Sequence, residues 1–159
     1  MGPTPMRIVL DTNVLVRAVV NVRSASGRIL SACERRGVIA LLSRPVLREY
    51  QATLFHPELV RRHLRLDRAV LKAALARLSY VGELHRSVSV RFEFRRDPRD
   101  AKFIELAIAG RATHLITSDP DLLDLKHGHD ETAKRFRRRV GGLEVLEPGE
   151  FMASHGDEI

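Results

Sequence analysis

The sequence predicts an α/β fold built on a mainly parallel sheet, and three observations support this. Short β-favouring runs such as Arg7–Leu10 alternate along the chain with apolar residues at helical spacing. Helices are expected to start directly after strands, at a capping residue or a proline, as at Ser118-Asp119-Pro120. An acid also stands at the end of more than one strand. Such alternation is typical of parallel sheets, whose ligands bind beyond the carboxyl ends of the strands.

The first half of the chain is expected to contribute two strands and a series of amphipathic helices. RIVL at residues 7–10 ends at Asp11, and an apolar helical stretch follows to about Val20. Residues 21–27 are polar and turn-rich. The further elements expected here are a helix at 28–36, a strand at 38–42, a helix from 45 to 54, and two helices within 58–81, the second at 67–80.

The second half is organised around residues 97–125, DPRDAKFIELAIAGRATHLITSDPDLLDL. Pro98 suits a first helical position with Asp97 as N-cap, apolar residues follow at helical spacing, and Gly110 supplies the stop. Residues 114–117 read as a buried strand. We also expect a strand or extended connector at 87–90, a closing strand at 143–146, a turn at 148–149 and a short helix at 150–154.

A length of 159 residues is most economical as one domain at 6–154, with flexible tails at 1–5 and 155–159. No apolar run is long enough to cross a bilayer, and the N-terminus lacks the pattern of a secretory signal. The single cysteine, Cys33, excludes an internal disulfide and offers no metal cluster, which fits a reducing cytoplasm. His127 and His129 show no zinc-like spacing with cysteine either. We therefore expect a cytoplasmic protein.

The charge points to a polyanionic partner. Lysine and arginine total 27 against 20 acids, a formal charge of +7, and arginine dominates. The planar arginine side chain suits phosphate, so a basic chain with acids at strand ends is arranged like a metal-dependent enzyme acting on nucleic acid. An arginine-rich composition can also reflect a GC-rich genome. Two basic runs are candidate RNA contacts, although each would also suit a solvated face or loop: Arg61, Arg62, Arg65 and Arg68, and residues 134–139.

The acids near strand ends each have an ordinary structural explanation. Asp97 with Asp100 resembles a capping box, and Asp119 is well placed as the N-cap of the next helix. Asp121 would then complement the dipole in the first turn of that helix. Asp11 could likewise cap the helix that follows it. Function is indicated only if acids from several segments point to one place.

A shared site follows when these acids are collected: Asp11, Asp100 and Asp119, joined by Glu49 from a flanking helix. Crowded carboxylates repel one another, and without a cation at least one takes up a proton. Mg²⁺ accepts oxygen ligands, and the remaining acids can orient metal-bound water. Phosphodiester hydrolysis is the reaction class that follows. Glu49 could instead pair with an arginine such as the adjacent Arg48.

The motifs resemble a known family. RIVLDTNVLVRAVV at residues 7–20 resembles the opening of PIN-domain ribonucleases, and residues 96–125 are similar to PIN-family toxins of toxin–antitoxin systems. Residues 143–151, which end in PGEF, match the closing strand and turn of that group. The similarity covers about residues 6–153.

This resemblance implies a three-layer α/β/α sandwich and an Mg²⁺- or Mn²⁺-dependent endoribonuclease that cuts single-stranded RNA. It also implies an antitoxin partner that blocks the site, and a homodimer or higher homo-oligomer. The residues that it carries over are Asp11, Glu49, Asp100 and Asp119 as catalytic and metal-binding acids, Asp121 as a further metal ligand, and Thr12, Asn13 and Thr117 as supporting groups.

Two other functions remain open on the sequence. A non-catalytic RNA- or protein-binding module on the same fold would explain the basic runs. A metal-dependent phosphatase is weaker, because nucleophilic-aspartate phosphatases carry a second Asp two residues after the first, where this chain has Asn13.

Overall fold

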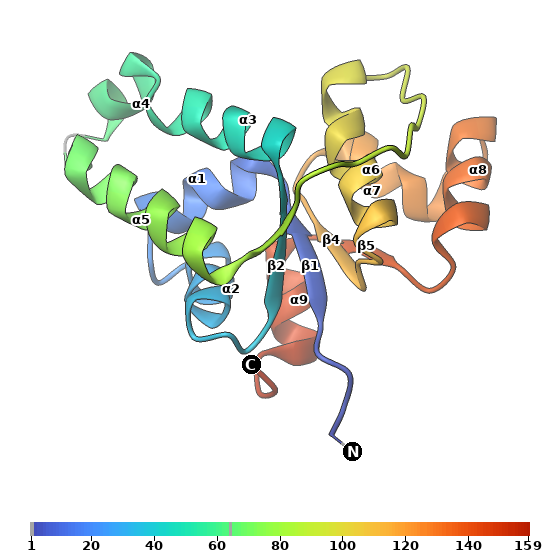
Figure 1. Cartoon of the computed structure of the whole chain (residues 1–159), viewed down its shortest axis with the longest axis horizontal. Coiled ribbons are helices and arrows are strands. Elements are labelled where there is room, and N and C mark those ends of the chain that lie inside the picture. Colours follow the sequence, from blue (N-terminus) through green and yellow to red (C-terminus); the bar gives the residue numbers. More distant parts are fainter. Residues whose placement is uncertain (1, 64) are drawn as a thin grey trace.

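A five-stranded parallel sheet forms the middle layer of the computed structural model, which describes residues 2–63 and 65–159 (Figure 1). The strand order is β3-β2-β1-β4-β5, and each neighbouring pair is parallel. The strands are β1 (Arg7–Leu10), β2 (Ile39–Ser43), β3 (Glu83–His85), β4 (His114–Ile116) and β5 (Glu144–Leu146). The expected parallel α/β architecture is confirmed.

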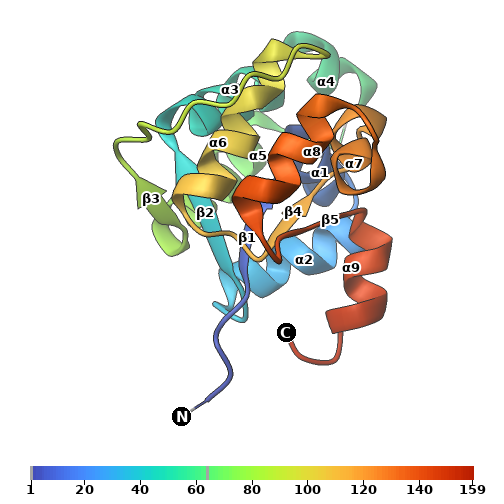
Figure 2. The same ribbon diagram turned by 90° about the vertical axis from the view of Figure 1, so that its right-hand side faces the viewer.

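Helices cover both faces of this sheet and complete the α/β/α sandwich. In Figure 1 the sheet is seen nearly edge-on, with α1 to α5 on one side and α6 to α8 on the other, and Figure 2 shows α6 and α8 lying over the strands. The helices are α1 (Thr12–Val20), α2 (Ala25–Glu34), α3 (Arg44–Leu54), α4 (Pro57–Arg62), α5 (Arg68–Val81), α6 (Ala101–Ala109), α7 (Pro120–His127), α8 (Glu131–Val140) and α9 (Pro148–His155), with a 3₁₀ turn at Pro98–Asp100 before α6.

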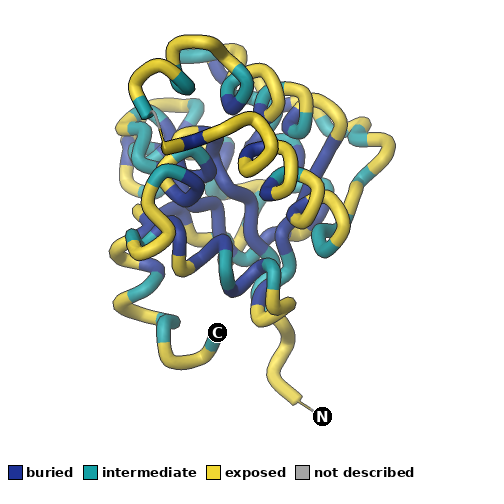
Figure 3. The backbone as a smooth tube through the Cα atoms, turned by 90° about the vertical axis from the view of Figure 1, so that its left-hand side faces the viewer, coloured by how far each residue is buried: buried dark blue, intermediate teal, exposed yellow. Residues whose placement is uncertain are grey.

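The hydrophobic core lies along the strands, as Figure 3 shows by the buried trace through the middle of the molecule. Ile8 and Val9 of β1 are fully buried although they point to opposite faces of the sheet. Strands buried on both faces are expected to read as continuous apolar runs, as RIVL does. The short β-branched runs were therefore a sound guide to the central strands.

The strand order reverses between β1 and β4, which lie side by side in the sheet. From β1 the chain builds outward through β2 to β3, and it then returns to place β4 and β5 on the other side of β1. In open α/β sheets the crevice beyond the carboxyl ends of the strands at such a reversal is where ligands bind. The end of β1 and the end of β4 are therefore the places to look for a site.

Two expectations about individual elements need correction, and one open alternative is decided. Residues 87–90 form the extended connector and not the strand, and the third strand along the chain is Glu83–His85, in which the Glu83 side chain accepts two hydrogen bonds from Arg7, at 2.6 and 2.9 Å. Residues 134–139 form part of α8, so the loop interpretation of this basic run is wrong. Helix α2 begins three residues early, because the Ser24 hydroxyl caps it by accepting a hydrogen bond from the Gly27 amide at 3.0 Å.

The C-terminal segment is packed more closely than the sequence suggests. Helix α9 begins at Pro148, so the expected turn at 148–149 is its first turn, and His155 is its last residue. Ile159, within the expected flexible tail, packs against the hydrophobic core. Within residues 2–63 and 65–159, no helix has the length and apolar character needed to span a membrane.

Candidate active site

Asp11 directly follows β1 and is the best-defined acid of the site. Its backbone amide donates to the Ile116 carbonyl of β4 at 2.9 Å, so the residue stands where the strand order reverses. The side chain is only 4% exposed. It is the N-cap residue of α1 but makes no side-chain capping bond, and its Oδ2 instead accepts a hydrogen bond from the buried Thr117 hydroxyl at 2.7 Å. The capping explanation therefore fails for Asp11.

Burial raises the pKa of the Asp11 carboxyl, because the charged form loses its hydration. Hydrogen bonds from Thr117 and from the Thr12 backbone oppose this rise, whereas the nearby negative charges of Asp119 and Glu49 add to it. A buried carboxylate held by hydrogen bonds and surrounded by other acids is a natural partner for a cation.

Asp100 comes to the same place from the second half of the chain. It ends the 3₁₀ turn and precedes α6, yet its side chain makes no capping bond, so the second acid of the apparent capping box is not used as one. The pKa of Asp100 rises from 3.8 to about 7, first because of burial and then because of the negative charges of Asp11, Asp97 and Asp119. In the absence of a cation this carboxyl holds a proton near neutral pH.

Asp119 follows β4 and has both a structural and a site role. Its Oδ1 accepts a hydrogen bond from the Asp121 amide at 2.9 Å, so the expected N-cap of α7 is confirmed. Its own amide donates to the Thr117 hydroxyl at 2.9 Å, while that hydroxyl donates to Asp11. Thr117 thereby links the Asp11 carboxylate to the backbone of Asp119, and its supporting role in a site stays a prediction.

Glu49 reaches the site from α3. Its Oε2 accepts a hydrogen bond from the Thr12 hydroxyl, and its Oε1 lies 2.5 Å from the Lys102 ammonium group of α6. The partner considered for this acid, Arg48, is exposed instead. The buried Tyr50 hydroxyl donates to the Leu10 carbonyl at 2.5 Å and so anchors α3 to the end of β1.

The other candidate residues lie at the margin of this group. Asp97 caps the 3₁₀ turn, accepting from the Arg99 amide at 3.1 Å. The Arg96 guanidinium lies 3.5 Å from the Asp121 carboxylate. The same guanidinium is 2.9 Å from the Asp124 carboxylate and 3.3 Å from that of Asp130. Asn13 is exposed on the first turn of α1.

The donor set suits a hard divalent cation such as Mg²⁺ or Mn²⁺, because all four acids offer carboxylate oxygens and the neighbouring negative charges raise the pKa of Asp11 and of Asp100. Their oxygens are nevertheless spread apart. Among the described residues, the three-residue group whose ligand atoms all lie within 4.8 Å of one another is His114, Glu144 and His155, elsewhere in the molecule. Asp11, Asp100 and Asp119 are the residues that would hold such an ion.

Sequence reasoning missed two cations of this region, Lys102 and Arg96. Lys102 is separated from Glu49 by 53 positions, so no local pattern pairs them. Lys102 also lines a groove of about 310 Å³ that runs over the carboxyl ends of β2 and β3. The basic and acidic side chains that line this groove are Arg44, Arg48, His85, Arg86, Arg91, Lys102 and Glu105.

The basic run of α8 is largely occupied with structural contacts. Arg135 donates to the Glu93 carbonyl, Arg137 to the Leu125 and Gly128 carbonyls, and Arg139 to the Arg91 carbonyl. These bonds attach α8 to neighbouring segments and leave fewer cations for a polyanion than the sequence suggests.

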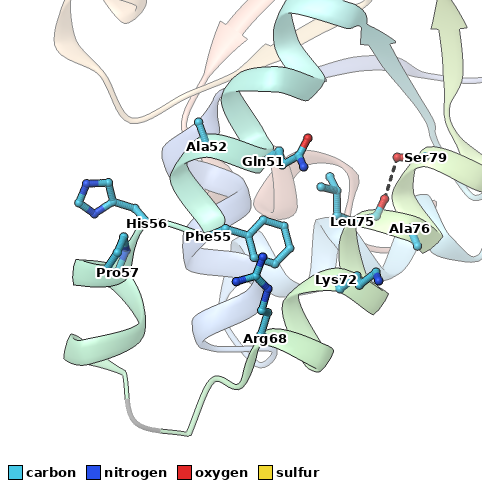
Figure 4. Close-up of a pocket in the computed structure, with 10 residues that line it drawn as sticks. All are labelled: Gln51, Ala52, Phe55, His56, Pro57, Arg68, Lys72, Leu75, Ala76 and Ser79. Atoms are coloured by element: carbon cyan, nitrogen blue, oxygen red, sulfur yellow. Dashed lines mark hydrogen bonds between the residues drawn. The ribbon is translucent and has the colours of Figure 1, made fainter.

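A larger pocket, of about 750 Å³, lies between α3 and α5 and contains none of the acids (Figure 4). Phe55 forms its wall, and the Arg68 guanidinium lies over the ring, 5.4 Å from its centroid. The Arg68 member of the expected basic cluster therefore packs on an aromatic side chain here.

The chain matches the family model described as PIN domain over residues 7–121, a span that contains all four acids. This chain belongs to the PIN-domain family. PIN domains are generally nucleases that typically use a divalent metal. The chain is also 30% identical over 152 residues to Uncharacterized protein MJ1680 of Methanocaldococcus jannaschii, an alignment that covers 96% of this chain and 93% of that protein. No solved structure matches this chain.

Proposed function

We propose that this PIN domain is a metal-dependent endoribonuclease that hydrolyses phosphodiester bonds in single-stranded RNA. The observation that carries the proposal is the convergence of Asp11, Asp100 and Asp119 beyond the ends of β1 and β4, with Asp11 buried and hydrogen-bonded to Thr117. Glu49 approaches the same group from α3.

The side chains have distinct tasks in this reaction. A bound Mg²⁺ or Mn²⁺ would supply a nucleophilic water near neutral pH and neutralise charge on the phosphate. The Thr117 hydroxyl donates to the Asp11 carboxylate and accepts from the Asp119 amide, so it holds the two acids at the ends of neighbouring strands, from which they would hold the ion. The proton that Asp100 holds near pH 7 is the one that a cation would displace. Glu49, held by Thr12 and Lys102, borders the site.

The groove next to Lys102 supports RNA as the substrate. The groove begins at Lys102, which pairs with Glu49, and continues over the ends of β2 and β3. Four arginines and a histidine also line it, and Glu105 is the one acid in its lining. A positive groove that leads away from a metal site suits the backbone of a single strand. Its small size and its polar lining favour a flexible strand over a rigid duplex.

The direct test is cleavage of fluorescent single-stranded RNA by the purified protein, with Mg²⁺, with Mn²⁺ and with chelator. We expect metal-dependent cleavage that falls by two orders of magnitude or more in Asp11→Asn and Asp119→Asn. The matched control is Asp157→Asn, an exposed aspartate near the C-terminus. Activity that survives chelation, or that persists in both site variants, contradicts the proposal.

The role of the groove is tested separately. Arg44→Glu with Arg86→Glu should raise KM for RNA and reduce the dependence of binding on salt, because two phosphate contacts are lost. Arg23→Glu, in the exposed turn between α1 and α2, is the control and should leave both unchanged. If Arg23→Glu raises KM for RNA as much as the groove variant does, RNA binding depends on the net charge of the protein and not on the groove.

We further propose, from the resemblance of the motifs, that the chain is the toxin of a toxin–antitoxin pair, works as a homodimer or higher homo-oligomer, and is inhibited by an antitoxin. Growth arrest on expression, relieved by Asp11→Asn, tests the toxin role, and light scattering tests the oligomer. The alternative is a non-catalytic RNA-binding module, which the Lys102–Glu49 pair favours because it neutralises one acid. Salt-dependent RNA binding without cleavage under any metal would decide for this alternative.

A further inference from the structure

A second group of metal-ligating side chains lies at the opposite edge of the sheet. His114 begins β4, Glu144 begins β5, and the two are direct partners in the parallel register. His155, the last residue of α9, packs its ring against that of His114, with centroids 4.9 Å apart. One ligand atom from each residue lies within 4.8 Å of the other two. The strands run away from this edge toward the acids, so the two groups are separate.

One ring nitrogen of His114 has a hydrogen-bond partner and the other does not. The Thr113 hydroxyl accepts from the Arg7 amide at 2.9 Å, lies 3.0 Å from the Arg7 carbonyl and is 2.8 Å from His114 Nδ1. In the Nδ1–H tautomer the ring donates this contact to the hydroxyl, and Nε2 is left with a lone pair.

His114 Nε2 lies 3.9 Å from Oε2 of Glu144, so the ring nitrogen and the carboxylate face each other. In the Nδ1–H tautomer both of these atoms are acceptors, and a cation between them would make the contact favourable. His114 is 7% exposed, and its ring packs edge-on against those of Phe151 and His155. A neutral imidazole with its other nitrogen hydrogen-bonded is the form that metals bind.

His155 supplies a second unsatisfied atom. Its Nδ1 is buried and makes no hydrogen bond in the described part of the chain, and Oε2 of Glu158 stands 3.5 Å away without forming one. A buried nitrogen left in this state costs free energy unless a ligand satisfies it. The ring is held in place by Phe151, whose centroid is 5.1 Å away.

We propose that His114, Glu144 and His155 form a zinc site that fastens helix α9 to the start of β4 and β5. Two imidazoles and one carboxylate are a borderline ligand set that zinc accepts in tetrahedral geometry. Bonds of about 2.0–2.2 Å place the ligands of one zinc ion roughly 3.4 Å apart, whereas His114 Nε2 and Glu144 Oε2 are 3.9 Å apart and all three ligand atoms lie within 4.8 Å of one another, so the side chains must move inward by about an ångström. Glu144, half exposed, is able to make it, and water can complete the coordination.

The test is titration of metal-stripped protein with Zn²⁺ by calorimetry, carried out in the Asp11→Asn/Asp119→Asn background so that the acidic site does not contribute. We expect one equivalent to bind, and Glu144→Gln and His155→Gln each to weaken binding by at least about tenfold. Saturating zinc should raise Tm by roughly 5 °C in the background protein and not in the two ligand variants. His129→Gln, which removes an exposed histidine, is the matched control.

X-ray absorption at the zinc edge provides an independent readout and should show two imidazoles among nitrogen and oxygen ligands. Both ligand variants change side chains with exposed surface, so they are expected to fold. Absence of stoichiometric binding, or binding unaffected by Glu144→Gln and His155→Gln, would overturn the proposal and leave an aromatic packing cluster. Because the acidic site is disabled throughout, this result is independent of the ribonuclease proposal.

Discussion

Replacing Asp100 with asparagine should make the metal-free protein more stable while abolishing RNA cleavage. Asp100 lies among Asp11, Asp97 and Asp119, whose negative charges oppose its ionisation. The Asp100 side chain makes no capping hydrogen bond to α6, so replacing it with asparagine removes no helix-capping interaction. The substitution therefore removes an unfavourable charge from the folded state and a ligand from the proposed metal site.

The size of the effect follows from the pKa. The Asp100 carboxyl titrates at about 7 in the folded protein and at its ordinary value of 3.8 when unfolded. Between these values the folded state binds one proton more, so the free energy of unfolding falls as the pH rises from about 4 to about 7. The full difference corresponds to about 4 kcal/mol. Solvent screening of a partly exposed carboxyl reduces this to roughly 1–2 kcal/mol, or about 3–6 °C in Tm.

The assay is thermal unfolding of metal-free protein at pH 5 and at pH 8. Asp100→Asn should melt above the wild type at pH 8 and close to it at pH 5, and Asp157→Asn should follow the wild type at both. Millimolar Mn²⁺ at pH 8 should stabilise the wild type more than the variant. An Asp100→Asn protein that melts at or below the wild type at pH 8 would refute the idea of mutually repelling carboxylates.

Three other substitutions test single contacts. Thr117→Val keeps the shape of a buried side chain but removes the hydroxyl that fixes two acids, so cleavage should fall at least tenfold, measured as kcat, with a loss of about 1–2 kcal/mol in urea unfolding. Tyr50→Phe leaves the carbonyl at the end of β1 without its donor and should cost about 1–2 kcal/mol in the same measurement, whereas an unchanged midpoint would show that water replaces the hydroxyl. Glu83→Gln breaks the two-bond contact with Arg7 and should cost about 0.5–1 kcal/mol at pH 7. Because that contact lowers the pKa of Glu83, the difference should be lost as the pH falls through that lowered pKa, and a difference that stays undiminished in strong acid would contradict it.

The sequence was most informative where local patterns and the sheet agree. Apolar β-branched runs buried on both faces located β1, β2 and β4, and the acids that follow β1 and β4 lie together because parallel strands end at one edge. Asp97 and Asp119 cap as their positions predict. Asp11 and Asp100 stand at the same kind of position without capping, and only the structure distinguishes these two roles.

Long-range pairings were beyond local reasoning. The Glu49–Lys102 pair joins residues 53 positions apart, and β3 depends on Arg7, which is 76 positions from Glu83. The histidine group was missed for the same reason, since His114 and His155 meet only after α9 folds back along the sheet. Spacing rules find metal sites carried by one turn or one hairpin, whereas this cluster draws on two strands and a helix.

The reversal of strand order between β1 and β4 also determines when the acids can come together during synthesis. Asp11 is made near the start of the chain, yet Thr117 and Asp119 come more than a hundred positions later. A nascent chain that has not reached β4 has no partner for the open edge of β1 and lacks Asp119, an acid that lies near Asp11. If the chain is the ribonuclease proposed above, a truncation before residue 114 should keep Asp11 but lose RNA cleavage.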